Sequence, residues 1–157
     1  MTDYALLQKE IRALAEEARD HVPLFANVSA LLFEALPDLN WAGFYLMDEG
    51  SLVVGPFQGK VACVRIPVGK GVCGTAVLRD ETVRVADVHA FPGHIACDGA
   101  SASEIVVPIH ENGEVVGVLD IDSPLKERFT KEDQEGLEGI VRVLEETADF
   151  SRLRRKG

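Results

Sequence analysis

The sequence predicts an α+β fold in which helices from both ends of the chain cover one face of an antiparallel β-sheet, and loops cover a ligand pocket on the other face. Three observations predict this class. Apolar residues recur at helical spacing near both termini, shorter runs between them have the pattern of strands, and turn residues join these runs directly. A chain of 157 residues with 46% apolar residues fits a single domain, residues 1–157, with a hydrophobic core.

The helices are predicted from apolar stripes and from the residues that limit them. A stripe over residues 7–18 indicates a first helix, which we expect to end at Pro23, and a second helical segment spans 24–36. Thr130 and Asp133 resemble an N-cap pair that opens a long helix near the C-terminus. The stripes of the terminal helices fit either a core face or a homodimer interface.

Between the helices the pattern changes to strands. We predict strands over residues 41–47, 51–57, 62–68, 82–87, 103–110 and 114–122, and a short helix over 71–80. Because most neighbouring strands are separated only by short turns, the sheet is expected to be mostly antiparallel.

The turn of the last hairpin decides which acidic side chains share a face. A two-residue turn at 112–113 pairs Glu104 with Ile121. Side chains alternate along a strand, so this register turns Glu104 away from Asp120.

A three-residue loop with Gly113 in the left-handed region gives another register. It places Glu104 opposite Asp120, with Asp122 on the same face. Three carboxyl groups gathered there are costly unless they are solvated, protonated or bound to a cation, and both burial and like charge raise carboxyl pKa values. The alternative for Asp122 is a solvated strand end, whereas Asp120 interrupts an apolar strand. The residues leave both registers open.

The first strand offers an aromatic wall. Trp41, Gly43 and Tyr45 alternate onto one face, and the residues between them face the helices. The two aromatic rings would wall a small pocket, with Gly43 leaving room for a ligand. The alternative is ordinary aromatic packing.

Composition excludes several classes of function. The net charge of −10 argues against a nucleic-acid surface, which needs clustered Lys and Arg. No apolar run approaches the roughly 18–20 residues of a membrane span, and the N-terminus lacks the pattern of a signal peptide. We therefore expect a cytoplasmic protein with neither nucleic-acid nor membrane partners.

The three cysteines, Cys63, Cys73 and Cys97, do not form a disulfide scaffold of the secreted type. Their spacing matches no zinc pattern such as CxxC, even with His89 and His94 as additional ligands, so we predict no metal site. Inert burial is the common fate of a free cysteine. Cys97 departs from that expectation because it lies among glycine and small polar residues.

Five segments of the chain form a distinctive set: NWAGFYL, VGPFQGKVACVRI, GKGVCGTA, VADVHAFPGHIACDGASASEIVVPI and GVLDIDSP. Together they closely resemble the free methionine-(R)-sulfoxide reductases, which are single GAF-domain enzymes. The resemblance runs from about Asn40 to the final helix and includes all three cysteines in order. It implies a cytosolic oxidoreductase that acts on free methionine sulfoxide, is regenerated by thioredoxin and holds no bound cofactor.

The resemblance also implies roles for individual residues. The family's catalytic cysteine falls on Cys97 and its principal resolving cysteine on Cys63, while Cys73 matches a third cysteine that is a candidate for recycling. The family's pocket acids fall on Glu104, Asp120 and Asp122, and its aromatic wall on Trp41 and Tyr45. This assignment favours the three-residue loop in the last hairpin.

The chemistry of such an enzyme agrees with these residue types. A thiolate attacks the sulfoxide sulfur, and a carboxyl group kept neutral, Glu104 or Asp122, protonates the leaving oxygen. The remaining carboxylates would pair with the substrate ammonium group. Cys97 would then be a sulfenic acid that condenses with a second thiol, in a loop hinged at Gly93 and Gly99. The competing interpretation is a GAF module that senses a small molecule or redox state without turnover.

Overall fold

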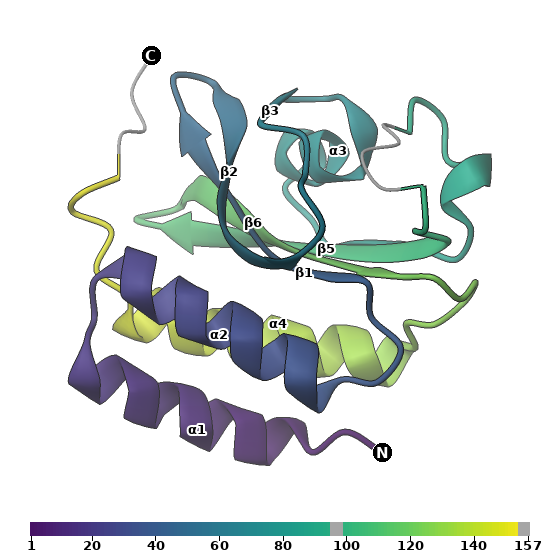
Figure 1. The fold of residues 1–157 in the computed structure, drawn as a ribbon. Coiled ribbons are helices and arrows are strands. Elements are labelled where there is room, and N and C mark those ends of the chain that lie inside the picture. Colours follow the sequence, from purple (N-terminus) through teal and green to yellow (C-terminus); the bar gives the residue numbers. More distant parts are fainter. Residues whose placement is uncertain (95–98, 154–157) are drawn as a thin grey trace.

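Six strands form one antiparallel sheet in the computed structural model, which describes residues 1–94 and 99–153 (Figure 1). The strand order is β3-β2-β1-β6-β5-β4. The strands are β1 (Trp41–Asp48), β2 (Ser51–Gly59), β3 (Arg65–Pro67), β4 (Val83–Val85), β5 (Ser103–Glu111) and β6 (Glu114–Ser123). The helices are α1 (Tyr4–Glu17), α2 (His21–Ala35), α3 (Gly71–Arg79) and α4 (Lys131–Thr147), with a 3₁₀ turn, η1, at Val88–Ala90.

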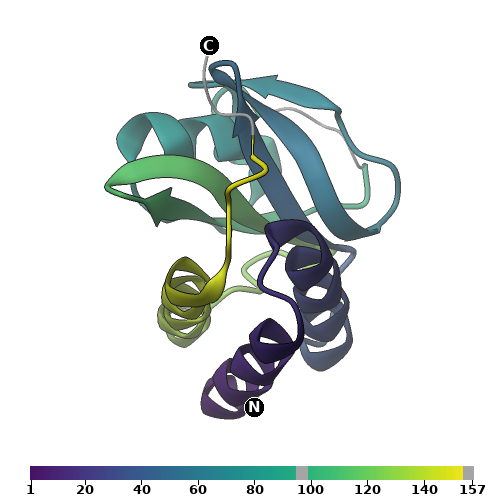
Figure 2. The ribbon, with the colours of Figure 1, turned by 90° about the vertical axis from the view of Figure 1, so that its left-hand side faces the viewer.

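The helices lie in layers on the two faces of the sheet. Helices α2 and α4 pack against one face, α1 lies beneath them, and α3 covers the other face (Figures 1 and 2). The predicted α+β class is therefore confirmed, although the first helix contacts other helices rather than the sheet. In the described parts of the chain no helix is long and apolar enough to cross a membrane.

The boundary between the first two helices differs from the prediction. Helix α1 ends at Glu17, six residues before Pro23, and Pro23 lies in the first turn of α2. Proline is tolerated there because the N–H groups of a first helical turn have no partner within the helix. The Asp20 side chain caps α2 by accepting a hydrogen bond from the Val22 N–H at 2.9 Å.

Two apolar clusters lie on opposite faces of the sheet. The larger one joins the sheet to the helical layer and includes Ile11 of α1, Phe44 of β1 and Ile140 of α4. The stripes of the terminal helices are therefore core faces. The smaller cluster lies between the sheet and α3 and contains Trp41 and Tyr45 together with Cys73.

The last hairpin has a two-residue turn, which is one of the two alternatives that the residues left open, although the resemblance favoured the three-residue loop. It also has a bulge that the sequence did not predict. Glu111 pairs with Glu114 across a two-residue turn in which Asn112 and Gly113 have φ values of 54° and 81°. Farther along, Ile109 pairs with Gly117, so Val116 is an extra residue in β6.

This bulge corrects both predicted registers. Glu104 pairs with Asp122, and Val106 pairs with Asp120. Neither the two-residue nor the three-residue register is right, because the turn has two residues and the bulge then shifts the pairing. The expected result nevertheless holds, since Glu104, Asp120 and Asp122 all lie on the face that α3 covers.

Gly43 does not leave room for a ligand, and that expectation is wrong. A Cβ atom at this position would lie 2.2 Å from the Phe57 Cβ and 2.7 Å from its Cα. The glycine therefore allows β2 to approach β1 closely, at a shift of register between Gly43 and Tyr45. As a consequence Phe57 stacks on Trp41, with ring centroids 5.0 Å apart.

Candidate active site

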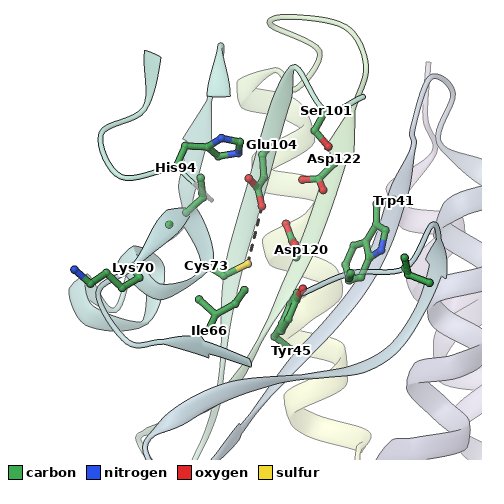
Figure 3. A pocket seen from close by; sticks show the side chains of 14 residues that line it. Trp41, Tyr45, Ile66, Lys70, Cys73, His94, Ser101, Glu104, Asp120 and Asp122 are labelled. Atoms are coloured by element: carbon green, nitrogen blue, oxygen red, sulfur yellow. Dashed lines mark hydrogen bonds between the residues drawn. The ribbon is translucent and has the colours of Figure 1, made fainter. Parts of the chain in front are cut away.

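A small cavity of about 50 Å³ lies between the sheet and α3 (Figure 3). Its walls come from strands β1, β3, β5 and β6, the segment after β2, the start of α3 and the segment before β5. The lining residues are Trp41, Tyr45, Val61, Ala62, Ile66, Lys70, Gly71, Val72, Cys73, His94, Ser101, Glu104, Asp120 and Asp122. The cavity therefore contains the predicted acids, the predicted aromatic wall and one predicted cysteine.

Two acids and a thiol meet in this cavity with very little exposure. Glu104 is 8% exposed, Asp120 is 5% exposed and Cys73 is 4% exposed. Their side chains point toward one another from β5, β6 and α3 (Figure 3), and the Cys73 Sγ lies 4.0 Å from the Glu104 Oε2, to which it donates. One ligand atom from each of the three lies within 4.8 Å of the others, which is a spacing at which side chains can hold a metal ion.

Local backbone conformation places Cys73 at this point. Helix α3 begins at Gly71, whose φ of 61° is in the left-handed region that favours glycine. Gly74 packs so closely that a Cβ there would lie 2.5 Å from the Pro67 carbonyl oxygen. These two glycines bring the start of α3 against the preceding segment, and Cys73 between them faces Glu104.

Burial and like charge set the proton affinities of the site. Desolvation, followed by the charges of Asp120 and Asp122, raises the pKa of Glu104 well above its usual range. Burial also raises the pKa of the Asp120 carboxyl, while the polar side chains of Glu104, Cys73 and Asp122 next to it act to lower that pKa. The expected state near neutral pH is a protonated Glu104 beside two other acids.

Cys73 is held as a thiol by the same surroundings. Burial raises its pKa well above the usual value, and the charges of Asp120 and Glu104 raise it further. A buried thiol with a raised pKa is a poor nucleophile, since the thiolate is the reactive form.

The aromatic wall also anchors a neighbouring segment. The Trp41 and Tyr45 rings stack with centroids 5.8 Å apart. The Tyr45 hydroxyl donates to the Cys63 carbonyl oxygen at 3.0 Å, and the Trp41 Nε1–H donates to the Lys60 carbonyl oxygen at 3.1 Å. Together they fix the segment after β2, so partly buried Cys63 lies beside the residues that line the cavity.

Some residues of the site were not singled out from the sequence. Ser101, Ile66 and Lys70 are such residues, and they line the cavity. His94 lines it too, although the sequence suggested it only as an additional metal ligand, and its pKa is lowered by burial and then by His89. His94 could have been predicted as a lining residue, because it lies within the PGHIACD motif. The predicted catalytic cysteine, Cys97, lies outside the residues that the structure describes.

Comparison with known proteins identifies the family. A family model for the GAF domain matches residues 25–146. The chain is 54% identical over 153 residues to the free methionine-R-sulfoxide reductase of Escherichia coli (strain K12), an alignment that covers 96% of this chain and 93% of the relative. The chain belongs to the free methionine-R-sulfoxide reductases.

Further members of this reductase family support the assignment. A free methionine-R-sulfoxide reductase of Saccharomyces cerevisiae is 49% identical over 133 residues, covering 80% of this chain and 74% of the relative. The structure of fRMsr of Staphylococcus aureus in complex with substrate superposes with a TM-score of 0.90 at 50% identity, covering 95% of this chain and 97% of that one. The predicted resemblance, the GAF fold and the assignment to an oxidoreductase are confirmed.

The raised pKa of Glu104 makes a testable prediction about stability. Folding raises this pKa. The contribution of the carboxyl to the free energy of unfolding is therefore fully present below the unfolded pKa of about 4.3, and it is lost as pH rises through the folded pKa. Glutamine resembles the protonated acid and cannot ionise. Glu104→Gln is therefore expected to raise the free energy of unfolding relative to the parent, with a gain that grows from about pH 5 to about pH 8.

Urea unfolding of both proteins at each pH measures this difference. Glu114→Gln, at an exposed position of the same hairpin, is the matched control and should show no pH-dependent gain. If the free energies of unfolding of Glu104→Gln and the parent differ by the same amount at about pH 5 and about pH 8, a protonated Glu104 is contradicted.

Proposed function

We propose that this enzyme reduces free methionine-(R)-sulfoxide to methionine, with Cys97 as nucleophile, Glu104 as proton donor and Cys63 as resolving cysteine. The observation that carries the proposal is the burial of Glu104 in the cavity beside two further acids, an arrangement that raises its pKa and favours the protonated form. A reductase of sulfoxides needs such a donor, because the sulfoxide oxygen leaves as a hydroxyl group.

The first half of the reaction transfers the sulfoxide oxygen to Cys97. The Cys97 thiolate attacks the sulfoxide sulfur while Glu104 protonates the oxygen. The S–O bond of the substrate breaks as an S–S bond to Cys97 forms, and the oxygen leaves as hydroxide. The hydroxide then attacks the Cys97 sulfur and breaks the S–S bond, so methionine leaves and Cys97 becomes a sulfenic acid. The sulfur of the substrate is reduced by two electrons and Cys97 is oxidised by two.

The second half restores the dithiol. The Cys63 thiol attacks the sulfenic acid, water leaves, and a Cys63–Cys97 disulfide forms. Thioredoxin then reduces this disulfide by thiol exchange. The position of Cys63 supports its role, because Tyr45 and Trp41 anchor its segment beside the cavity. Cys73 is a weaker candidate because it is buried as a thiol.

The same cavity accounts for the choice of a free amino acid. Asp120 and Asp122 offer negative charge for a substrate ammonium group, and such a charge-assisted contact is strong where water is excluded. A methionine sulfoxide within a polypeptide has an amide in place of that ammonium group, and its flanking chain would not fit a small cavity. Trp41 and Tyr45 offer an apolar face to the S-methyl group.

Cysteine variants test the order of the steps. Reduced Cys97→Ser is expected to release no methionine from free methionine-(R)-sulfoxide. Cys63→Ser is expected to release a single methionine per protein and then to stop, because its sulfenic acid has no partner. Methionine is quantified by chromatography, with and without thioredoxin and its reductase. This measurement distinguishes the two variants.

Two outcomes would overturn these roles. Full thioredoxin-dependent turnover in Cys63→Ser would assign the resolving role to Cys73. Binding of methionine sulfoxide without release of methionine by the parent protein would instead favour a GAF sensor.

A second prediction concerns the proton donor. Glu104→Gln keeps the shape of the acid but cannot donate its proton, so kcat should fall by the roughly 10²–10⁴-fold typical of losing a general acid. The variant should still bind substrate. Asp122→Asn is the comparison, and a larger loss of kcat there, with Glu104→Gln near the parent rate, would make Asp122 the donor. Steady-state kinetics over a pH series measures both.

A further inference from the structure

We propose that in the reduced enzyme Cys73, Glu104 and Asp120 together bind a thiophilic divalent cation such as Zn²⁺, and that the bound cation excludes substrate from the cavity. The metal is an inhibitor and not a resident cofactor. The binding site stands on the geometry alone, whereas its inhibitory effect rests on the proposed reduction of methionine sulfoxide.

The three ligand atoms already lie close to a coordination geometry. They come from α3, β5 and β6 and lie within 4.8 Å of one another. A tetrahedral Zn²⁺ with bonds of about 2.3 Å to sulfur and 2.0–2.2 Å to oxygen separates its ligands by about 3.4–3.6 Å. The Cys73 Sγ and the Glu104 Oε2, at 4.0 Å, need only a small approach to reach this spacing.

An oxygen atom without a partner points to a missing ligand. The Asp120 Oδ1 is buried and has no hydrogen-bond partner among the residues that the structure describes. The side chain is 5% exposed, so solvent does not supply a donor readily. A carboxylate oxygen buried without a donor costs free energy, and a coordinated cation would remove that cost.

Ligand chemistry selects the class of cation. A thiolate favours borderline and soft ions such as Zn²⁺ and Cd²⁺, whereas Mg²⁺ and Ca²⁺ take oxygen ligands and keep more of them. Three protein ligands leave a fourth position for water, and the cavity of about 50 Å³ has room for a cation with one water molecule. Binding replaces the protons of Cys73 and Glu104 with the metal.

Metal and substrate compete because they use the same groups. Glu104 is the proposed proton donor, and Asp120 offers its charge to the substrate ammonium group. A cation between them occupies both carboxyl groups. Zn²⁺ should therefore raise the KM for free methionine-(R)-sulfoxide and leave kcat unchanged.

Cd²⁺ is the probe for binding, because cadmium–thiolate coordination gives ultraviolet charge-transfer absorbance. The variant Cys63→Ser/Cys97→Ser, which keeps only Cys73, is reduced and titrated with Cd²⁺. We expect stoichiometric absorbance, and we expect its loss when Cys73→Ser is added. Glu104→Gln in the same background should weaken Cd²⁺ binding about tenfold or more, and Mg²⁺ should not compete.

The controls keep the result independent of folding and turnover. Circular dichroism establishes that each variant is folded, and Glu104→Gln removes a ligand without exposing the core. Absorbance that requires Cys63 or Cys97, or no binding by the Cys73-only variant, would overturn the site. Binding that follows Cys73 without a change of KM in the parent would overturn the competition while leaving the site in place. If the parent shows no turnover, the proposed function fails but the Cd²⁺ titration still decides the site.

Discussion

The burial of one carboxyl group beside other acids, between the sheet and α3, is the constraint on which the site depends. Glu104 is buried beside Asp120 and Cys73, and like charge and desolvation both keep its proton in place. A solvated Glu104 would ionise and lose its value as an acid. Every feature that closes the cavity therefore helps to raise the pKa of Glu104, as its proposed role as proton donor requires.

Several parts of the fold serve this burial. The bulge in β6 brings Asp122 opposite Glu104, and the glycine turn before α3 brings Cys73 over the sheet. The aromatic wall closes the side toward β2. The helices on the opposite face supply a larger apolar cluster, and this core provides stability that a cluster of buried acids does not.

The sequence predicted the helices and strands well, but it did not predict the register in which the strands pair. Apolar spacing found the helices and strands, since each buries one face and the spacing follows from that. It could not find the bulge at Val116, because an extra residue within the continuous apolar run at 115–119 breaks no alternation and leaves no local mark. Gly43 was interpreted as space for a ligand because the close approach of Phe57 occurs at a shift of register between β1 and β2, which the residues of β1 alone do not reveal.

The site was predicted in composition but not in arrangement. Resemblance identified the acids and the aromatic wall, and the structure brings them to one cavity. The hydrogen bonds from Trp41 and Tyr45 to the segment that carries Cys63 join residues far apart in sequence, so no spacing rule revealed them. The burial that makes Cys73 a thiol is likewise a property of packing.

The protonation state of Glu104 can be measured directly. The protein is labelled with ¹³C at glutamate side-chain carboxyl carbons, the Glu104 signal is assigned by its absence in Glu104→Gln, and its chemical shift is followed as pH is raised. The account predicts that this carboxyl stays protonated well above the pKa of about 4.3 of an unperturbed glutamate. A midpoint in the ordinary glutamate range would contradict it.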